Sequence, residues 1–192
     1  FNDFELKIGY TFNNKELIRE ALTHKSLNPS INYERLEFLG DSLLNVIITE
    51  WLYQKYPTHN EGFLTEKRAG LVNKKFLIII AEKILLKDNI ILGNSIQKKN
   101  KQTIDNILSD VIESIIGAIF IDSGIQDAKI FINKHLLVYL NSSKILSRNY
   151  KGILIERCHE LGYEEPLFKS IELKIKNSIK FQATINIKNI LY

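Results

Sequence analysis

The sequence predicts an all-α domain over residues 1–143, followed by a small α-β-β unit over residues 148–192. Up to about residue 143, apolar side chains recur every three or four residues, which is typical of amphipathic helices. From residue 171 to residue 188 they alternate strictly, which is typical of β-strands. The polar stretch 141–144 lies between the two patterns, and we interpret it as a linker.

Capping residues and helix breakers mark several ends of the helices expected in the first domain. Asn13 or Asn14 can cap a helix that runs to Leu22, and Asn73 can cap a later one. Pro57 stops a long helix, and Gly124 separates two others. The remaining segments, 58–62 and 87–105, are expected as loops. After the helix ending at Leu22, the expected helices are 33–56, 64–72, 74–86, 103–122 and 126–140.

The second unit is expected to begin with a helix over 149–161 that ends at Gly162. Two alternating segments then lie on either side of Asn177 and Ser178, which predicts a β-hairpin. A two-stranded sheet is only marginally stable by itself. We therefore expect this unit to be incomplete.

Composition excludes several classes of protein. The chain is 45% hydrophobic and 25% charged, as is usual for a globular protein. No apolar run approaches the roughly 20 residues that span a bilayer, so no membrane partner is expected. Cys158 is the only cysteine, which predicts a reducing, cytoplasmic location. The chain starts at Phe1 and contains no methionine, so we expect it to be a piece of a longer protein.

The positive charge is concentrated at one end. Residues 1–143 have no net charge, and residues 144–192 carry the whole excess of +4. A basic module beside a neutral one indicates a polyanionic partner such as nucleic acid. A solvated basic surface is the alternative.

The long helix expected at 33–56 carries Glu34, Glu37 and Asp41 on one stripe, within about 60° of one another. An ordinary amphipathic helix would have a broad polar face around such acids. Here hydrophobic side chains border the stripe, so the acids are expected in a narrow polar groove. The bordering residues are Phe38, Leu44 and Ile48, and those expected to face the core are Leu36, Leu39, Leu43, Val46 and Ile47.

The helix expected at 103–122 repeats this arrangement. Asp110 and Glu113 share one face of a segment that is otherwise apolar nearly all round, which predicts burial. Gly117 lies on the same stripe, where it would let another backbone or a ligand approach closely.

Four carboxylates on two buried helices require positive compensation. No lysine or arginine has the matching spacing on the second helix, and Arg35 on the first points away. All-oxygen ligands favour Mg²⁺ or Mn²⁺, which activates water and stabilises charge in phosphoryl transfer. Salt bridges to residues elsewhere are the alternative. A di-iron centre would need Glu-x-x-His motifs, and the four histidines supply none.

These residues resemble the ribonuclease III family. Segment 34–42, ERLEFLGDS, is similar to the family's signature, and segment 107–122 is similar to its second acidic motif. The match includes THKS at 23–26 and EGFL at 61–64, and order and spacing agree over residues 4–140.

The resemblance implies an all-α endonuclease domain that forms a homodimer. It implies Mg²⁺-dependent hydrolysis of double-stranded RNA, with Mn²⁺ as a possible substitute, no small-molecule cofactor, and 5′-phosphate and 3′-hydroxyl ends. Processing of rRNA precursors and of mRNA is the expected role. By position, the catalytic metal ligands are Glu37, Asp41, Asp110 and Glu113, the supporting acids at the dimer interface are Glu34 and Glu61, and the aromatic that inserts into the partner is Phe38.

The second unit resembles the start of a double-stranded-RNA-binding domain, with Lys151 and Lys180 as candidate RNA contacts. Two other functions stay open. A non-catalytic, RNA-binding or ribosome-associated relative would keep the fold, but such relatives usually lose some of the acids. A helical protein–protein scaffold would leave the paired acids unexplained. For Phe38, packing in the core of its own chain is the alternative to insertion into a partner.

Overall fold

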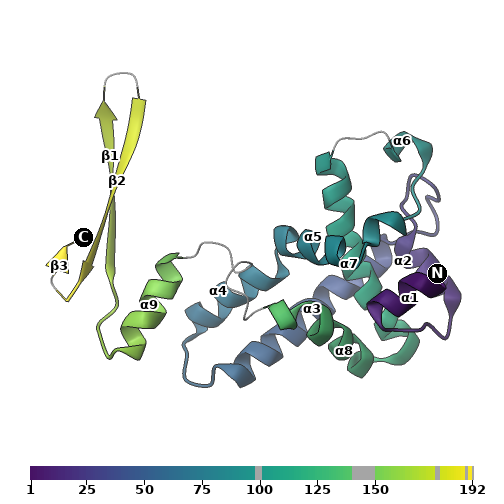
Figure 1. Cartoon of the computed structure of the whole chain (residues 1–192), viewed down its shortest axis with the longest axis horizontal. Helices are drawn as coiled ribbons and strands as arrows, with labels where there is room; N and C mark the ends of the chain where they lie inside the picture. Colours follow the sequence, from purple (N-terminus) through teal and green to yellow (C-terminus); the bar gives the residue numbers. More distant parts are fainter. Residues whose placement is uncertain (98–100, 140–149, 176–177, 189, 192) are drawn as a thin grey trace. The chain divides into compact units, whose positions relative to one another are not determined.

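The computed structural model describes residues 1–97, 101–139, 150–175, 178–188 and 190–191. The chain divides into two compact units, Phe1–Ser147 and Arg148–Tyr192, which are described separately (Figure 1). The first unit is helical and the second combines a helix with an antiparallel sheet, so the predicted fold class is confirmed. The expected linker at 141–144 lies outside the described residues. No described helix has both the length and the apolar composition that a membrane crossing needs.

The helices expected in the first unit occur in the expected order, but the helix Asn2–Ile8 was not expected. Two short 3₁₀ turns are η1 (Leu86–Asp88) and η2 (Leu137–Tyr139). The bounds of the helices are α1 (Asn2–Ile8), α2 (Lys15–Leu22), α3 (Glu34–Lys55), α4 (Glu61–Val72), α5 (Lys74–Lys83), α6 (Asn94–Gln97), α7 (Lys101–Ser123) and α8 (Ile125–His135).

Side-chain caps explain where several of these helices begin. The Oδ1 atom of Asn14 accepts a hydrogen bond from the backbone N–H of Glu16, and Asn73 caps α5, both as predicted. Helix α4 begins three residues earlier than expected, because the Asn60 Oδ1 atom accepts from the Phe63 N–H at 2.9 Å. Gly124 separates α7 from α8 with a φ of 90°, a conformation that favours glycine.

The interpretation of residues 87–105 as a loop was wrong in part. Helix α6 lies within this range, and α7 begins at Lys101; residues 98–100 lie outside the described part. Long-range backbone pairing helps to order the segment: the Ile91 N–H donates to the Leu22 carbonyl at 2.8 Å, and the Ile91 carbonyl accepts from the His24 N–H at 2.9 Å. Local sequence patterns carry no sign of such distant partners.

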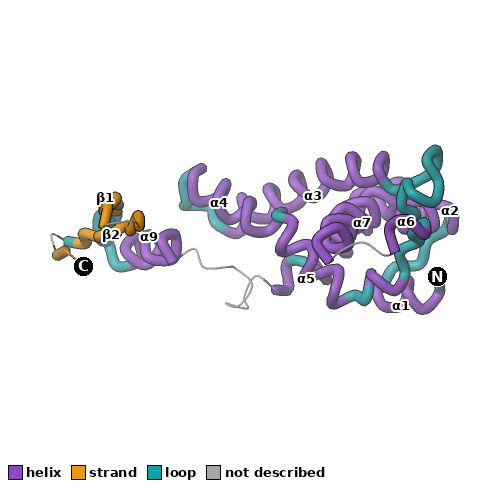
Figure 2. Tube along the Cα trace, turned by 90° about the horizontal axis from the view of Figure 1, so that it is seen from above, coloured by secondary structure: helices purple, strands orange, loops and turns teal. Residues whose placement is uncertain are grey.

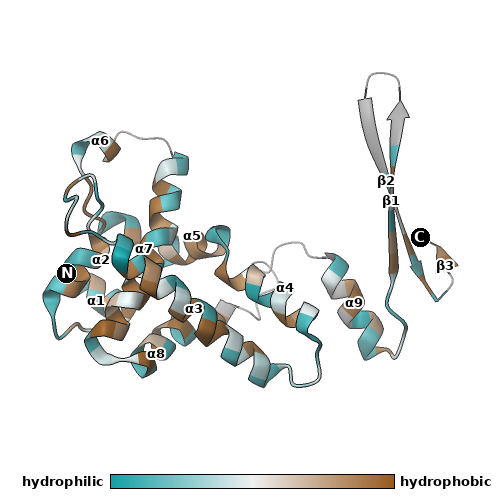
Figure 3. Ribbon diagram, turned by 180° about the vertical axis from the view of Figure 1, so that it is seen from behind, coloured by the Kyte–Doolittle hydropathy of each residue, from teal (hydrophilic) through white to brown (hydrophobic). Residues whose placement is uncertain are grey.

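Helix α7 forms the centre of the first unit. It contacts α2, α3, α5 and α8, and it lies between α3 and α5 in Figure 2. Its apolar residues from Ile107 to Ile119 are buried, and hydrophobic ribbon colours gather on α7 and its neighbours (Figure 3). The predicted burial of this helix is therefore confirmed, and it gives the two acids of α7 a rigid support.

The outer face of α3 differs from the expectation. Val46 was expected to face the core, but it is exposed, whereas Leu44 and Ile48 are fully buried. Helices α7 and α4 both pack against α3. The face of α3 that is buried is therefore rotated about the helix axis from the face that was expected to be buried. As a result, α3 presents an apolar side chain to solvent at Val46.

The second unit contains helix α9 (Tyr150–Glu160), whose chain turns at Gly162 with a φ of 67°. Strands β1 (Leu167–Ile175) and β2 (Ser178–Ile187) form the predicted antiparallel hairpin. The register pairs Leu167 with Asn186 and Ile175 with Ser178. A short third strand, β3 (Ile190–Leu191), pairs with the end of β2 and was not expected.

Candidate metal centre

Two glycines allow α3 and α7 to cross at very short range. A Cβ atom built on Gly40 would overlap the carbonyl oxygen of Glu113, and one built on Gly117 would overlap the carbonyl oxygen of Leu36. The close approach expected at Gly117 is therefore confirmed, and Gly40 is its counterpart on α3. Because the backbones meet here, the first turns of α3 lie directly against the acidic face of α7.

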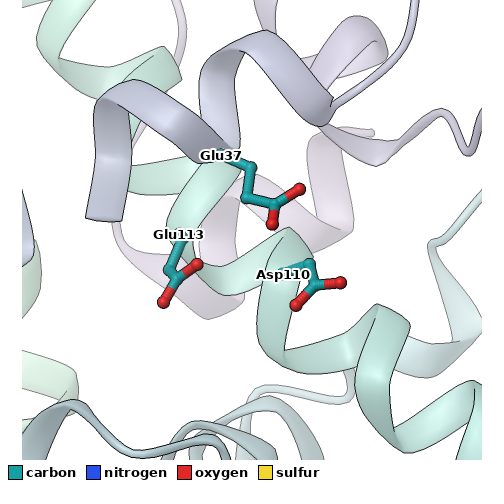
Figure 4. A group of neighbouring side chains, drawn as sticks. All are labelled: Glu37, Asp110 and Glu113. Carbon is teal, nitrogen blue, oxygen red and sulfur yellow. The ribbon is translucent and has the colours of Figure 1, made fainter. Parts of the chain in front are cut away.

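Glu37, Asp110 and Glu113 converge at this crossing. Each offers a carboxylate oxygen, and these oxygens all lie within 4.8 Å of one another. Figure 4 shows Glu37 reaching from α3 toward the two acids of α7. All three side chains are half-buried, so solvent screens their mutual repulsion only in part.

The crowding perturbs the acidity of two of these carboxyl groups. Burial raises the pKa of Glu113 to about 8, and the charges of Asp41, Asp110 and Glu37 add to the effect. Burial also raises the pKa of Glu37 to about 7, with a further contribution from Asp110. At neutral pH and without a cation, the centre therefore holds protons that ordinary glutamates would have released.

Asp41 lies at the edge of the centre. Its side chain is exposed, and its Oδ1 atom accepts a hydrogen bond from Asn45 Nδ2 at 2.9 Å. It does not belong to the group of oxygens within 4.8 Å. Its charge nevertheless contributes to the raised pKa of Glu113, so it belongs to the same electrostatic site.

Two lysines approach the acids from other elements, and the sequence reasoning missed both. Lys74 Nζ, at the start of α5, lies 3.2 Å from Asp110 Oδ1. Lys25 Nζ, in the turn after α2, lies 2.6 Å from Glu34 Oε1. Spacing along the acidic helices predicts neither lysine, because each lies outside the helix of the acid it pairs with.

The donor set fits a divalent cation. All of its ligand atoms are carboxylate oxygens, which suit Mg²⁺ or Mn²⁺. The three oxygens lie within 4.8 Å of one another, close enough for one cation to bind all of them. Among the described residues, Lys74 and Lys25 offset only part of the negative charge, as the raised pKa values of Glu37 and Glu113 indicate.

Glu61 lies elsewhere within the chain. As the first residue of α4, it accepts a hydrogen bond from the Thr65 hydroxyl at 2.6 Å. It lines a hollow of about 210 Å³ together with Thr49 and Tyr53 of α3. Thr49 follows Glu37 by twelve residues on α3, roughly 18 Å along the helix. The fold therefore does not bring Glu61 to the carboxylate centre of its own chain.

Phe38 points into solvent. Its side chain is 79% exposed, which excludes the alternative of packing in the core of its own chain; insertion into a partner stays a prediction. Val46 and Tyr53 are also exposed, and helical spacing places both within about 80° of Phe38 on α3. These three exposed side chains, called the outer strip below, lie along α3, with Phe38 next to Glu37 at the carboxylate centre.

The candidate RNA contacts of the second unit are only partly described. The Lys151 ammonium lies over the ring of Phe168, 4.6 Å from its centroid. Lys180 lies on β2 and pairs with Leu173, but its side chain is outside the described part. An RNA contact at either residue stays a prediction.

Known proteins resemble the chain over most of its length, which includes most of the helical unit. A family model described as Ribonuclease-III-like matches residues 14–140. Ribonuclease 3 of Psychrobacter arcticus is 50% identical over 124 residues, which cover 65% of this chain and 46% of that protein. Ribonuclease 3 of Campylobacter fetus is 41% identical over 157 residues, which cover 81% of this chain and 70% of that protein. The chain thus spans about half the length of the first relative.

Solved structures agree with these matches. The nuclease domain of ribonuclease III from Campylobacter jejuni superposes with a TM-score of 0.68 and 38% identity, covering 76% of this chain and 97% of that one. A second structure of that domain, with a TM-score of 0.65 and 40% identity, covers 69% of this chain and 95% of that one. It is described for structural flexibility in a region involved in dimer formation.

Proposed function

The chain belongs to the ribonuclease III family, and on this premise we propose that it is an endoribonuclease that hydrolyses double-stranded RNA. The observation that carries the proposal is the convergence of Glu37, Asp110 and Glu113 at the crossing of α3 and α7. The products are strands with 5′-phosphate and 3′-hydroxyl ends.

Glu37, Asp110 and Glu113 would hold a divalent cation, Mg²⁺ or Mn²⁺, with Asp41 as a fourth ligand from the edge of the site. When bound, the cation supplies an activated water and positive charge for the oxygens that gain negative charge during phosphodiester hydrolysis. The protein contributes two glutamates, Glu37 and Glu113, whose pKa values are raised while no cation is bound. These groups must release protons when the cation binds, so its affinity should increase as pH rises through 7 to 8.

The active form is a homodimer built on α3 and α4. Phe38 exposes an aromatic ring at one end of the outer strip, and the 210 Å³ hollow lies near Tyr53 at the other end. A two-fold axis would let each copy insert Phe38 into the hollow of its partner, because an isologous interface pairs the same two patches twice. The hollow has room for a phenyl ring and is lined mainly by apolar surface.

This arrangement also gives Glu61 a role. Glu37 precedes Phe38 on α3, and Glu61 lines the hollow that would receive the partner's Phe38. Docking would therefore bring Glu61 toward the carboxylate centre of the other subunit, where it acts as a supporting acid. Glu34, held by Lys25 at 2.6 Å, supports the same centre from within its own chain.

The basic second unit would add contacts to the phosphates and 2′-hydroxyls of duplex RNA, which proteins read mostly by shape. The physiological substrates are rRNA precursors and mRNA, and the reaction takes place in the cytoplasm. The non-catalytic and scaffold alternatives give no reason for three carboxylates to crowd at one helix crossing.

A cleavage assay on one long RNA duplex tests the proposal. We expect cleavage with Mg²⁺ or Mn²⁺, none with EDTA, and none of a single strand of the same sequence. The fragments should be ligatable through their 5′-phosphates without prior kinase treatment. Binding of the duplex with no cleavage at any concentration of either metal would instead support the non-catalytic alternative.

A further inference from the structure

Lys74 brings a positive charge to the carboxylate centre. Its ammonium nitrogen lies 3.2 Å from Asp110 Oδ1, and Asp110 is one of the three converging acids. Its charge also lowers the pKa values of Glu37 and Glu113, against the stronger effects that raise them. Lys74 therefore acts on all three acids, whereas Lys25 pairs with Glu34 outside the group and, of the two glutamates, lowers only the pKa of Glu37.

The start of helix α5 sets the position of the Lys74 backbone. The Asn73 side chain caps α5 through the Phe76 N–H at 2.9 Å, and its amide donates to the Gly70 carbonyl at 2.7 Å. Lys74 is thus the first residue of α5, where the helix dipole disfavours a cation. Lys75 has the same disadvantage, is exposed and has no ion pair with the described residues. It is a matched control for Lys74.

We propose that Lys74 is a displaceable counter-ion of the carboxylate centre, which stabilises the metal-free site and competes with the incoming divalent cation for Asp110. The inference rests on the proposed function, because it takes these acids as the metal ligands. A cation bound to Asp110 would repel an ammonium 3.2 Å from the same carboxylate, so its binding weakens the ion pair and favours withdrawal of the lysine.

The two partners of the ion pair differ in exposure in the way that displacement requires. The Lys74 side chain is 65% exposed, and that of Asp110 is 19% exposed. The lysine can therefore withdraw into solvent without disturbing the core, while Asp110 stays fixed on α7. Ion pairs with an exposed partner are weak, so a doubly charged ion can replace this one.

Titration of the metal-free chain with Mn²⁺ alone, with no RNA, tests the inference by calorimetry. We expect K74Q to bind Mn²⁺ roughly three- to tenfold more tightly than the wild type, because the competing charge is gone. K74R, which keeps the charge, and K75Q should bind like the wild type. Without metal, the Tm of K74Q should fall below that of K75Q by roughly one to four degrees, and saturating Mn²⁺ should remove the difference.

Equal or weaker Mn²⁺ binding by K74Q would overturn the inference, whatever its effect on RNA binding. A loss of duplex binding in K74Q with unchanged Mn²⁺ affinity would instead identify Lys74 as a phosphate contact. If the wild type itself binds no Mn²⁺, the metal site of the proposed function fails, and the role of Lys74 fails with it. The two failures are therefore distinguishable.

Discussion

Gly40 of α3 lies directly against the backbone of Glu113 on α7, so closely that a Cβ atom at Gly40 would overlap the Glu113 carbonyl oxygen. The contact joins the backbone of one acidic helix to a proposed metal ligand on the other. It fixes the separation at which Glu37 meets Asp110 and Glu113. The spacing of the carboxylates is thus determined by two backbones rather than by flexible side chains.

An alanine at Gly40 should separate the two helices. Because backbone atoms cannot move aside as a side chain does, we expect G40A to lower the free energy of unfolding by roughly 1–3 kcal/mol or more. Urea unfolding measures this change. Cleavage by the folded fraction should fall by about a hundredfold, since small misplacements of reacting groups have effects of that size.

Gly62 provides the control for this substitution. It lies in the first turn of α4, and a Cβ there would meet only Asn60 Oδ1, at 3.6 Å. G62A should therefore be neutral or stabilising by up to about 1 kcal/mol. If G40A were as stable and active as G62A, the close crossing would not position the acids.

The metal-free protein should lose stability as pH rises through 7 to 8. Its native state keeps protons on Glu37 and Glu113 up to pKa values of about 7 and 8, whereas the ordinary pKa of glutamate is 4.5. The native state thus binds more protons over this interval, and the free energy of unfolding decreases with rising pH. Urea unfolding in EDTA at a series of pH values measures the decrease.

The buried histidines His24 and His135 have lowered pKa values, so their effect on stability has the opposite sign and is complete about one pH unit above the ordinary histidine pKa of 6.5. The difference between wild type and E113Q at each pH isolates Glu113, because glutamine cannot ionise. We expect the decrease to be smaller in E113Q, and smaller in the wild type when Mn²⁺ is present. A wild-type stability that is flat or rising between pH 7 and 8.5 would contradict the assigned pKa values.

Truncation of Phe38 should weaken the dimer. A central aromatic anchor contributes about 2 kcal/mol or more, and the two-fold dimer contains two of them, so F38A should raise the dimer dissociation constant by roughly a thousandfold. Sedimentation equilibrium of the full chain measures it. L6A removes a comparably exposed side chain from α1, 78% exposed against 79%, and should have no effect. Equal dissociation constants for F38A and wild type would place the dimer interface elsewhere.

The carboxylate pairs could be predicted from the sequence because each lies on a single helix, where spacing determines the face. The hydrophobic borders of the stripe were also informative, although Val46 proved exposed. The lysines that pair with the acids could not be predicted from the sequence. Lys74 is 36 residues from Asp110, and only the packing of α5 on α7 brings the two together. The pairing of Ile91 with Leu22 depends on tertiary contacts in the same way.

Asp110 and Glu113 are proposed to hold the cation used in the hydrolysis of duplex RNA, and the single-turnover cleavage rate of E113Q tests this claim most directly. The substitution keeps the size of the side chain and removes its charge. E82Q, an exposed position on α5, serves as the control. We predict that E113Q and D110N cleave at least about a thousandfold more slowly than the wild type. Both should still bind the duplex, and E82Q should cleave normally. Cleavage by E113Q within about tenfold of the wild-type rate, at saturating Mg²⁺, would contradict the claim.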